Sequence, residues 1–262
     1  MLKPIKRLGQ NFLQDPNTIR KIVESLEAEP HDIVVEIGPG TGALTGPLSE
    51  KYASLYTLEV DTRAVELLQE EYPDVTTVLG DVLEFDWAAV ADRHDVSQIS
   101  VIGNLPYYIT SQILFALLEA APKIREAVIM MQYEVAERLV ARPRTKQYGI
   151  LSVATQLACR PKLLFPVSRN VFYPRPDVRS AVVRLDFDGV GSKPIDHAAV
   201  RKIIRVAFNQ RRKTLRNSLS SVVEEVGKAL PEAVAGKRAE ELSPDDFVEL
   251  AQYLLDGERS HT

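Results

Sequence analysis

The sequence predicts an α/β protein with a mostly parallel sheet, and three observations support this fold class. Short apolar runs alternate with amphipathic segments between residues 15 and 141. A glycine-rich turn, Gly38-Pro39-Gly40-Thr41-Gly42, directly follows one of these runs. Polar residues also follow the later runs, where strands should end. Strands that alternate with helices at this spacing require a parallel sheet with crossover helices on both faces.

The first expected element is a helix over residues 15–27, because Asp15 is a capping residue, Pro16 takes the first helical position and the apolar residues have helical spacing. Continuous apolar runs predict buried strands. They occupy residues 32–37, 55–60, 75–79, 100–102 and 127–131. Amphipathic segments between and after these runs predict helices over residues 41–51, 62–72, 111–121 and 133–141.

The pattern of the chain changes after Gly149. A helix is expected over residues 150–159, a strand over 160–166, a proline-rich loop over 167–177 and a strand of alternating pattern over 180–187. Residues 189–194 are the best linker candidate, and the chain beyond residue 197 has helical patterns only. We therefore predict two domains, 1–190 and 191–262, of which the second is small and all-α.

Composition restricts the class of protein. The chain has 262 residues, 45% hydrophobic and 26% charged, which is ordinary for a globular protein. Its apolar runs are shorter than the ~20 residues that span a membrane, and no signal peptide is expected. A single cysteine, Cys159, fits a reducing compartment, so we expect a cytoplasmic protein. Four scattered histidines and this cysteine form no metal-ligand pattern, so no metal is expected.

A basic segment stands out against the net charge of −4. Residues 198–217 contain seven Lys or Arg and no acid, so the rest of the chain carries about −11. A charge run is usually a solvated helix face, but here no acid within the segment can pair with the cations. The segment therefore favours an anionic partner, most plausibly a phosphate backbone.

The glycine turn predicts a nucleotide-like cofactor. Gly38, Gly40 and Gly42 allow a tight turn between a strand and a helix and a close approach of the backbone to a ligand. With Ala43, the same spacing also fits a dinucleotide fingerprint, so the turn alone does not identify the cofactor. A strand–helix turn without a ligand is the structural alternative.

Two carboxylates follow the next two strands. Glu59 can accept both hydroxyl protons of a ribose, and Asp81 can accept from an adenine amine. Either residue can instead cap the helix that follows it. Asp61 is expected to be a helix cap and not a ligand.

The turn Asn104-Leu105-Pro106-Tyr107 follows the fourth strand and can hold a planar amine. The Asn104 carboxamide oxygen and a backbone carbonyl, for which Leu105 is the candidate, can accept the two N–H groups, while the Tyr107 ring stacks on the base. An adenine amine is a poor nucleophile but is unprotonated at neutral pH, so it needs hydrogen-bond acceptors more than a strong base. A second aromatic pair, Phe172 and Tyr173, is held between prolines and can cover the opposite face of the base or fill the core.

With these residues in view, the chain resembles the KsgA-type family of small-subunit rRNA adenine N(6),N(6)-dimethyltransferases over nearly its whole length. The matching segments are LGQNFL (8–13), EIGPGTG (36–42), EVD (59–61), GD (80–81), NLPYYI (104–109), YGILSV (148–153), FYPRP (172–176) and FNQRRKTLRN (208–217). Each segment alone is moderately specific, and all of them in this order are highly specific. The resemblance departs from the family pattern at Arg175, where proline is usual.

The resemblance implies a Rossmann-like class I methyltransferase with a mostly parallel seven-stranded sheet, and S-adenosylmethionine as the methyl donor, with S-adenosylhomocysteine as product. It implies dimethylation of two adjacent adenosines near the 3′ end of small-subunit rRNA within a ribosomal particle, and a role in subunit biogenesis. We expect a monomer. The implied cofactor positions are Asn11, Leu13, Gly38, Gly40, Glu59, Asp81 and Asn104. The implied catalytic positions are Asn104, Leu105, Pro106, Tyr107 and Phe172, and the implied RNA-binding positions are Arg211, Arg212, Lys213 and Arg216.

Two alternatives stay open on the sequence. The erythromycin-resistance branch, which dimethylates one adenine of large-subunit rRNA, shares the Asn-x-Pro-Tyr turn, although residues 211–217 resemble the small-subunit branch. The second alternative is a non-catalytic assembly factor that keeps the fold and only binds RNA. The intact Asn104, Pro106, Tyr107 and glycines argue against it.

Overall fold

The structure, a computed structural model, describes residues 2–190 and 197–255, which form two compact units. The first, which we call the sheet unit, comprises the residues up to Ala136 and Cys159–Asp188. The second, the helical unit, comprises Glu137–Ala158 and the described residues from Gly189 onward. The chain therefore enters the helical unit twice.

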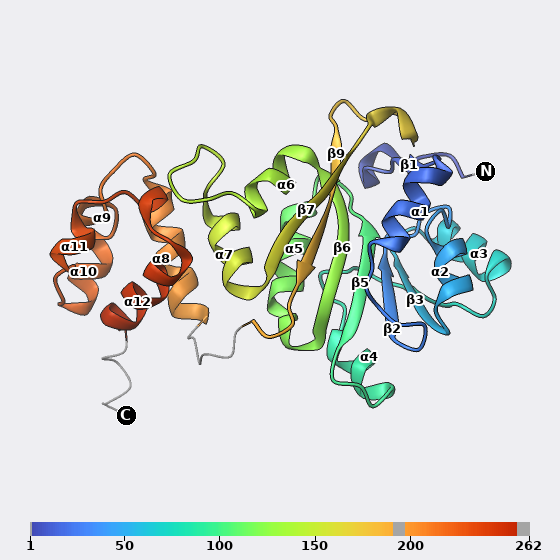
Figure 1. Cartoon of the computed structure of the whole chain (residues 1–262), viewed down its shortest axis with the longest axis horizontal. Helices are drawn as coiled ribbons and strands as arrows, with labels where there is room; N and C mark the ends of the chain where they lie inside the picture. The colour runs from blue at the N-terminus through green and yellow to red at the C-terminus, as the bar shows by residue number, and fades with distance from the viewer. Residues whose placement is uncertain (1, 191–196, 256–262) are drawn as a thin grey trace. The chain divides into compact units, whose positions relative to one another are not determined.

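The sheet unit is built on seven strands in the order β4-β3-β2-β5-β6-β9-β7 (Figure 1). Their bounds are β2 Ile33–Ile37, β3 Ser54–Glu59, β4 Thr76–Leu79, β5 Ile99–Asn104, β6 Ile124–Gln132, β7 Arg160–Val167 and β9 Ser180–Asp186. The pairs from β4 to β6 are parallel. Strand β9 pairs antiparallel with both β6 and β7, so the sheet is mostly parallel, as predicted.

The strand order reverses between β2 and β5. The chain runs outward from β2 through β3 to β4 and then returns to form β5 on the other side of β2. The carboxyl ends of β2 and β5 therefore lie side by side, with Ile37 paired with Gly103. In open α/β sheets such a switch point is where ligands bind.

Helices cover the sheet because its strands are apolar on both faces. They are α1 Pro16–Glu24, α2 Thr45–Lys51, α3 Thr62–Glu71, α4 Trp87–Arg93 and α5 Thr110–Glu119. One core cluster joins Ile22 and Val23 of α1 and Leu48 of α2 to the sheet residues Val34 and Ile102. Asp15 caps α1 by accepting from the Thr18 backbone N–H at 2.7 Å, as its position before Pro16 predicted.

A small two-stranded sheet lies outside the main one. It pairs β1 (Phe12–Leu13) antiparallel with β8 (Phe172–Tyr173). Leu13 and Phe172 face each other in register and both belong to the core cluster of the sheet unit. This pairing connects the N-terminal segment with the proline-rich loop, and the sequence pattern did not predict either strand.

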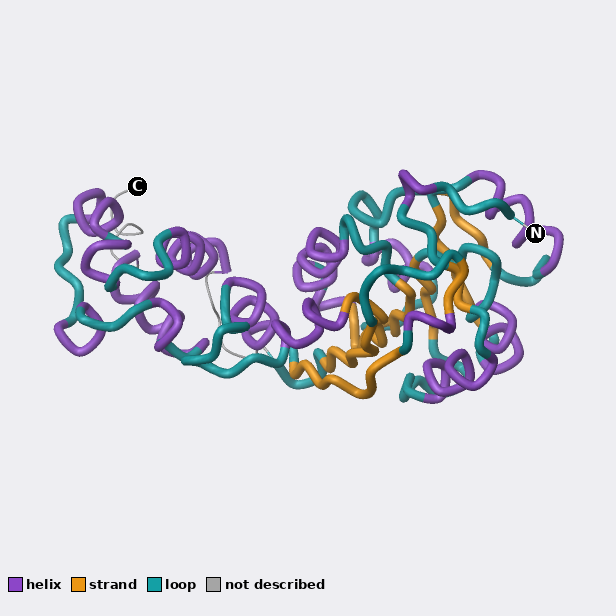
Figure 2. Tube along the Cα trace, turned by 90° about the horizontal axis from the view of Figure 1, so that it is seen from above, coloured by secondary structure: helices purple, strands orange, loops and turns teal. Residues whose placement is uncertain are grey.

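The helical unit contains helices and no strands among its described residues (Figure 2). Besides α7 (Ile150–Ala158) it contains α8 His197–Asn209, α9 Leu215–Ser218, α10 Ser220–Val226, α11 Glu232–Ala235 and α12 Pro244–Leu255. Its core includes Ile203, Leu219, Phe247 and the fully buried Tyr148, whose hydroxyl donates to the Leu242 carbonyl at 2.8 Å. The Tyr148-Gly149 segment is therefore a structural part of this unit.

The two units divide the chain at residue 189 and also in the middle of the chain. Residues 137–158, expected in the first domain, pack with the C-terminal helices because Tyr148 and Val153 are buried in their core. The predicted linker is described only for Gly189 and Val190, and residues 191–194 lie outside the described part of the chain. Helix α6 (Tyr133–Leu139) crosses from one unit to the other.

Among the described residues, no helix is both long and apolar enough to cross a bilayer.

The close pairing of β5 with β2 generates a stability prediction. A Cβ atom added to Gly103 would lie 2.6 Å from the Ile37 carbonyl oxygen, which is backbone and cannot move away. We expect Gly103→Ala to lower the melting temperature of the sheet unit, with a loss on the order of 1–3 kcal/mol. Gly80→Ala is the matched control, because its new Cβ would meet only the flexible Leu58 side chain at 3.4 Å. Equal melting temperatures for the two variants would contradict the proposed constraint.

Candidate active site

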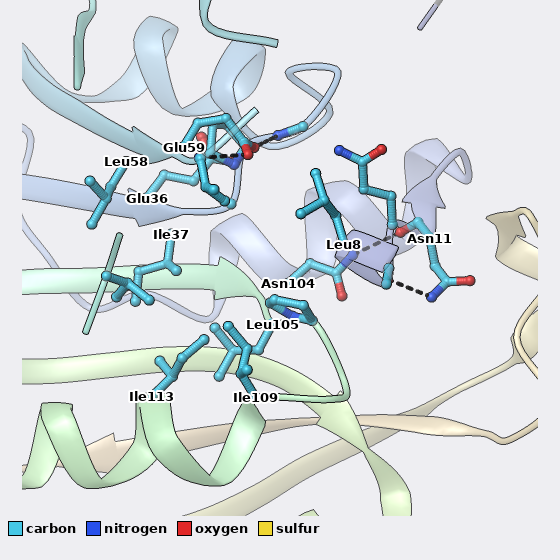
Figure 3. Close-up of a pocket in the computed structure, with 18 of the residues that line it drawn as sticks. Leu8, Asn11, Glu36, Ile37, Leu58, Glu59, Asn104, Leu105, Ile109 and Ile113 are labelled. Atoms are coloured by element: carbon cyan, nitrogen blue, oxygen red, sulfur yellow. Dashed lines mark hydrogen bonds between the residues drawn. The ribbon is translucent and has the colours of Figure 1, made fainter. Parts of the chain in front are cut away.

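A pocket lies at the carboxyl ends of β2, β3, β4 and β5, at the switch point of the sheet (Figure 3). Four loops that follow strands line it, together with the N-terminal segment 8–13. The predicted positions among its lining residues are Asn11, Leu13, Gly38, Gly40, Glu59, Asp81, Asn104, Leu105, Pro106 and Tyr107. The structure thus brings together every predicted cofactor position and four of the five predicted catalytic positions.

The glycine turn has the backbone conformation that its sequence requires. Gly38 and Gly40 have φ angles of 65° and 57°, in the left-handed region that glycine tolerates best. The Gly38 N–H donates to the Leu58 carbonyl at 3.0 Å, which ties the turn to β3. A Cβ atom at Gly40 would lie 3.0 Å from Cε1 of Phe12, so the turn also needs glycine for the close packing of the N-terminal segment.

Glu59 connects the end of β3 with the glycine turn. One carboxylate oxygen accepts from the Gly40 N–H at 3.1 Å, and the other accepts from the backbone N–H groups of Val60 and Asp61 at 2.8 and 2.9 Å. Burial raises the pKa of Glu59, while the three backbone N–H groups oppose that rise. The residue is held in place before any ligand is bound, with its carboxylate in the pocket wall.

The structure reveals a pocket residue that the sequence analysis did not select. Glu36 lies within the otherwise apolar β2, is 1% exposed and lines the pocket. It accepts a hydrogen bond from the Thr45 hydroxyl of α2 at 2.7 Å. Desolvation raises the pKa of Glu36 to about 8, and the charge of Glu59 acts in the same direction. A lone glutamate in a buried strand was the signal that could have found it, because a buried carboxyl needs a reason to be there.

The two aspartates near the strand ends have different surroundings, and Asp61 is a helix cap, as predicted. Asp61 caps α3 through the Arg63 N–H and also accepts from the Arg63 guanidinium and from the Gln10 amide at 2.9 Å. The Arg63 hydrogen bond lowers its pKa to about 2. Asp81 is exposed on the pocket wall, and one of its oxygens accepts from the Leu83 N–H at 2.9 Å.

The Asn104 carboxamide is oriented by the N-terminal segment. Its Nδ2 group donates to the Asn11 backbone carbonyl at 3.0 Å, the contact drawn as a dashed line in Figure 3. Only the NH₂ end of a carboxamide can donate to a carbonyl, so this bond fixes which end is which. No described residue donates to the Asn104 Oδ1 atom, which is left to accept hydrogen bonds in the pocket that Asn104 lines.

The next three residues complete the turn. Leu105 is buried, and its N–H donates to the Met130 carbonyl at 3.0 Å, which anchors the turn to β6. The Pro106 carbonyl accepts from the Thr110 hydroxyl and from the Ile109 N–H. The Leu105 carbonyl accepts from no described residue and can bind an amine. The Tyr107 hydroxyl is 2.7 Å from the buried Ser180 hydroxyl of β9, which holds the ring at the pocket, and burial raises the pKa of Tyr107.

The N-terminal segment forms one wall of the pocket. Gln10 is bonded to Asp61, the Asn11 carbonyl to Asn104, and Phe12 packs against Gly40. Asn11 and Leu13, which local sequence patterns could not have identified and only the family resemblance indicated, both line the pocket. Their placement depends on contacts with residues far along the chain, which no local pattern reports.

The structure does not bring Phe172 to the pocket. Its side chain is 5% exposed and packs in the core cluster with Leu13, whereas Tyr173 is 54% exposed. Neither residue is among those that line the pocket. Phe172 therefore fills the core in this structure, and its role as a second stacking surface stays a prediction.

The four predicted RNA-binding cations have different surroundings, all within the helical unit. The Arg211 guanidinium donates to Glu240 at 2.8 Å and to the backbone carbonyls of Thr145 and Lys146, so its Nε and Nη2 groups are used within the protein. Arg216 pairs with the exposed Glu232 at 3.0 Å. Arg212 and Lys213 are exposed and make no ion pair with any described residue. Acids from elsewhere in the chain therefore compensate part of the basic segment.

Within residues 2–190 and 197–255, no group of three or more His, Cys, Asp or Glu side chains is placed to hold a metal ion.

A glycine turn at the switch point, a carboxylate at the end of β3 and an Asn-x-Pro-Tyr turn that begins at the end of β5 define the class of protein: a Rossmann-like methyltransferase. The comparisons with known proteins agree. Residues 1–256 match the family model described as ribosomal RNA adenine dimethylase. The chain belongs to this family.

The relatives and solved structures are similar along nearly the whole chain. The ribosomal RNA small subunit methyltransferase A of Salinibacter ruber is 52% identical over 96% of this chain and 85% of its own length. The protein of the same name from Aromatoleum aromaticum is 40% identical over 95% of this chain and 93% of its own. The structure of the 23S rRNA methyltransferase ErmE is 27% identical, with a TM-score of 0.67 over 93% of this chain and 99% of that one. A dimethyladenosine transferase from Plasmodium falciparum shares the fold, at 24% identity, with a TM-score of 0.76 over 91% of this chain and 95% of that one.

The buried Glu36 generates a prediction about stability and pH. Its folded-state pKa of about 8 lies above the ordinary value of 4.5, so the folded state binds the extra proton. The stability that this proton contributes is complete below pH 4.5 and is lost as the pH rises to 8, at on the order of 1.4 kcal/mol per pH unit. Glu36→Gln, which stays neutral, should flatten this dependence.

The measurement is the free energy of unfolding by denaturant between pH 5 and 8.5 for the wild type and Glu36→Gln. Thr45→Val is a useful comparison, because it removes the hydroxyl that donates to Glu36 but keeps the carboxyl and its titration. A wild-type stability that stays constant across this range, or a Glu36→Gln variant with the same slope, would refute the assigned protonation.

Proposed function

We propose that the protein dimethylates the exocyclic amine of two adjacent adenosines near the 3′ end of small-subunit rRNA, with S-adenosylmethionine as methyl donor. The observation that carries this proposal is the Asn104 carboxamide, whose Nδ2 group is held by Asn11 while its Oδ1 atom is free in a pocket shared with the glycine turn. Membership of the ribosomal RNA adenine dimethylase family supports the reaction. The names of the curated relatives support the small subunit as the source of the RNA.

The residues present fit this cofactor. The glycine turn presents backbone rather than side chains to the pocket, the Glu59 carboxylate can accept from ribose hydroxyls, and the exposed Asp81 can accept from an adenine amine. Asn11 and Leu13 close the pocket from the N-terminal side. When bound, S-adenosylmethionine supplies an electrophilic methyl group on a sulfonium centre.

The turn after β5 acts on the target amine. The Asn104 Oδ1 atom and the Leu105 carbonyl each accept one N–H group, which favours a pyramidal nitrogen and stabilises the positive charge that develops on it. Tyr107, fixed through Ser180, stacks on the base. Because an adenine amine inside a stacked helix is out of reach, the target base must be extruded or already unpaired.

The proposal extends to the context of the reaction. The acceptor is rRNA within a ribosomal particle, the methylation accompanies small-subunit biogenesis, and the enzyme acts in the cytoplasm as a monomer. Exposed Arg212 and Lys213 support contact with a phosphate backbone.

The experiment incubates the purified protein with labelled S-adenosylmethionine and small subunits from cells that lack this modification. We expect label in the rRNA and N(6),N(6)-dimethyladenosine in its nucleoside digest, at two adjacent positions. Bound subunits without label would identify a non-catalytic binding factor and overturn the proposal. Label in large-subunit rRNA alone would support the erythromycin-resistance reaction, which the similarity to ErmE makes the second candidate.

Asn104→Ala tests the acceptor role directly. Loss of one transition-state hydrogen-bond partner should lower methyl transfer on the order of a hundredfold or more. Cofactor affinity should fall far less, because Glu59 and the glycine turn are unchanged. Label transfer and S-adenosylmethionine binding are measured on the same preparation, and a fully active variant would refute the role.

Phe172→Leu tests the predicted second stacking surface while keeping an apolar side chain in the core. If the ring stacks on the base, its loss should weaken transition-state binding by roughly 1–3 kcal/mol, seen in kcat/KM for the RNA. Tyr173→Leu is the matched control on the neighbouring, exposed position. A deficit in the Tyr173 variant and none in the Phe172 variant would assign the ring to Tyr173.

A further inference from the structure

The loop between α6 and α7 is a basic surface that the sequence analysis did not select. Arg142, Arg144 and Lys146 are all exposed, within the helical unit. Arg144 has a φ angle of 67°, which is uncommon outside glycine and marks a tightly defined turn. The Thr145 hydroxyl donates to the Arg142 carbonyl at 2.7 Å, and the Arg144 N–H donates to the Glu240 carbonyl at 2.7 Å.

Arg211 joins this loop to the basic segment. Its Nη2 group donates to the carbonyls of Thr145 and Lys146 at 3.1 and 2.9 Å, and its Nε group donates to Glu240 at 2.8 Å. A planar guanidinium can hold three such acceptors at once, whereas an ammonium cannot match this geometry. The exposed Arg212 and Lys213 follow Arg211 directly along the chain, so the bonds of Arg211 connect their segment with the loop.

The charge on this surface is mostly unpaired. Arg142, Lys146, Arg212 and Lys213 make no ion pair with any residue in the described part of the chain. Arg144 lies 3.7 Å from Glu241, and both side chains reach solvent, so the pair is weak. Glu240 is already bonded to Arg211. Five exposed cations, three from the loop and two from the segment that follows Arg211, thus face solvent.

The chemistry of the surface favours RNA over a protein partner. The exposed side chains between Arg142 and Gln147 are cationic or polar, and no exposed large hydrophobic residue lies among them. Protein interfaces need an apolar core, whereas phosphate contacts are made by Lys and Arg with hydroxyl and amide donors between them.

We propose that Arg142, Arg144, Lys146, Arg212 and Lys213 form one composite basic surface that binds the phosphate backbone of rRNA, and that Arg211 is the positioning residue that holds its two parts together. The proposal rests on the proposed function for the identity of the nucleic acid. It adds a positioning role to the RNA contact expected of Arg211, because the Nε and Nη2 donors of this side chain are used within the protein.

The first test compares two double variants that remove the same charge. Arg142→Gln with Arg144→Asn removes two cations of the surface, and asparagine tolerates the left-handed conformation at position 144. Lys123→Gln with Lys228→Gln is the control outside the basic segment, because these side chains contact Asp92 and the Tyr253 carbonyl instead. Binding to deproteinised small-subunit rRNA is measured from low to moderate salt.

We expect the loop variant to bind more weakly and to lower the slope of log K against log[salt] by roughly 1.4–1.8, the value for two lost phosphate contacts. The control should keep the wild-type slope. A loop variant with an unchanged slope would overturn the proposal. A defect seen with assembled subunits but not with deproteinised RNA would identify a protein partner and overturn it equally.

The second test addresses Arg211. Arg211→Lys keeps the charge but loses the three-acceptor geometry, so RNA affinity should fall in the wild-type background. It should fall much less in the Arg142→Gln, Arg144→Asn background, where two of the three loop cations are already removed. Equal losses in both backgrounds would indicate a general structural defect and refute the positioning role. Methyl transfer to rRNA by the wild type is measured in parallel, because its absence would refute the proposed function and not this surface.

Discussion

The site depends on how closely the backbones of β2 and β5 approach each other. Gly103 lies against the Ile37 carbonyl with no room for a Cβ atom, and both residues directly precede a loop of the pocket. The turn that follows β2 carries the glycines, and the turn that follows β5 carries Asn104. Since the strand order reverses at this pair, no other strand lies between the two loops. A cofactor and a target base can therefore meet here.

The N-terminal segment 8–13 contacts the residues at the ends of these strands and holds them in place. Asn11 orients the Asn104 carboxamide, Gln10 bonds to Asp61, and Phe12 packs on Gly40. One short segment thus contacts the loops that follow β2, β3 and β5. Asn11, which orients the Asn104 carboxamide, is a sequence neighbour of other residues that line the pocket, so the shape of the pocket and the orientation of Asn104 are physically connected.

Local sequence patterns predicted the features that depend on interactions between residues close together in the chain. The strands around Val34 and Val101, the Asp15 cap and the glycine turn follow from apolar runs, capping and backbone freedom, and all are confirmed. Asn11 and Leu13 needed the family resemblance, because their position depends on pairing with β8 and on Asn104. The surroundings of Arg211 could not be predicted, because an arginine that bonds to Glu240 looks the same in sequence as one that contacts RNA. The same holds for Phe172, because a ring that fills the core looks the same in sequence as one that stacks on a base. Glu36 was visible in the sequence, but its protonation depends on burial.

The double passage of the chain through the helical unit has a consequence for how the protein can be divided. Since residues 137–158 supply Tyr148 and Val153 to the helical core, a cut near residue 189 would leave these apolar side chains in water on the fragment that retains the sheet. The fragment that contains the C-terminal helices would in turn lack part of its interior. Neither of the two fragments is therefore a complete folding unit.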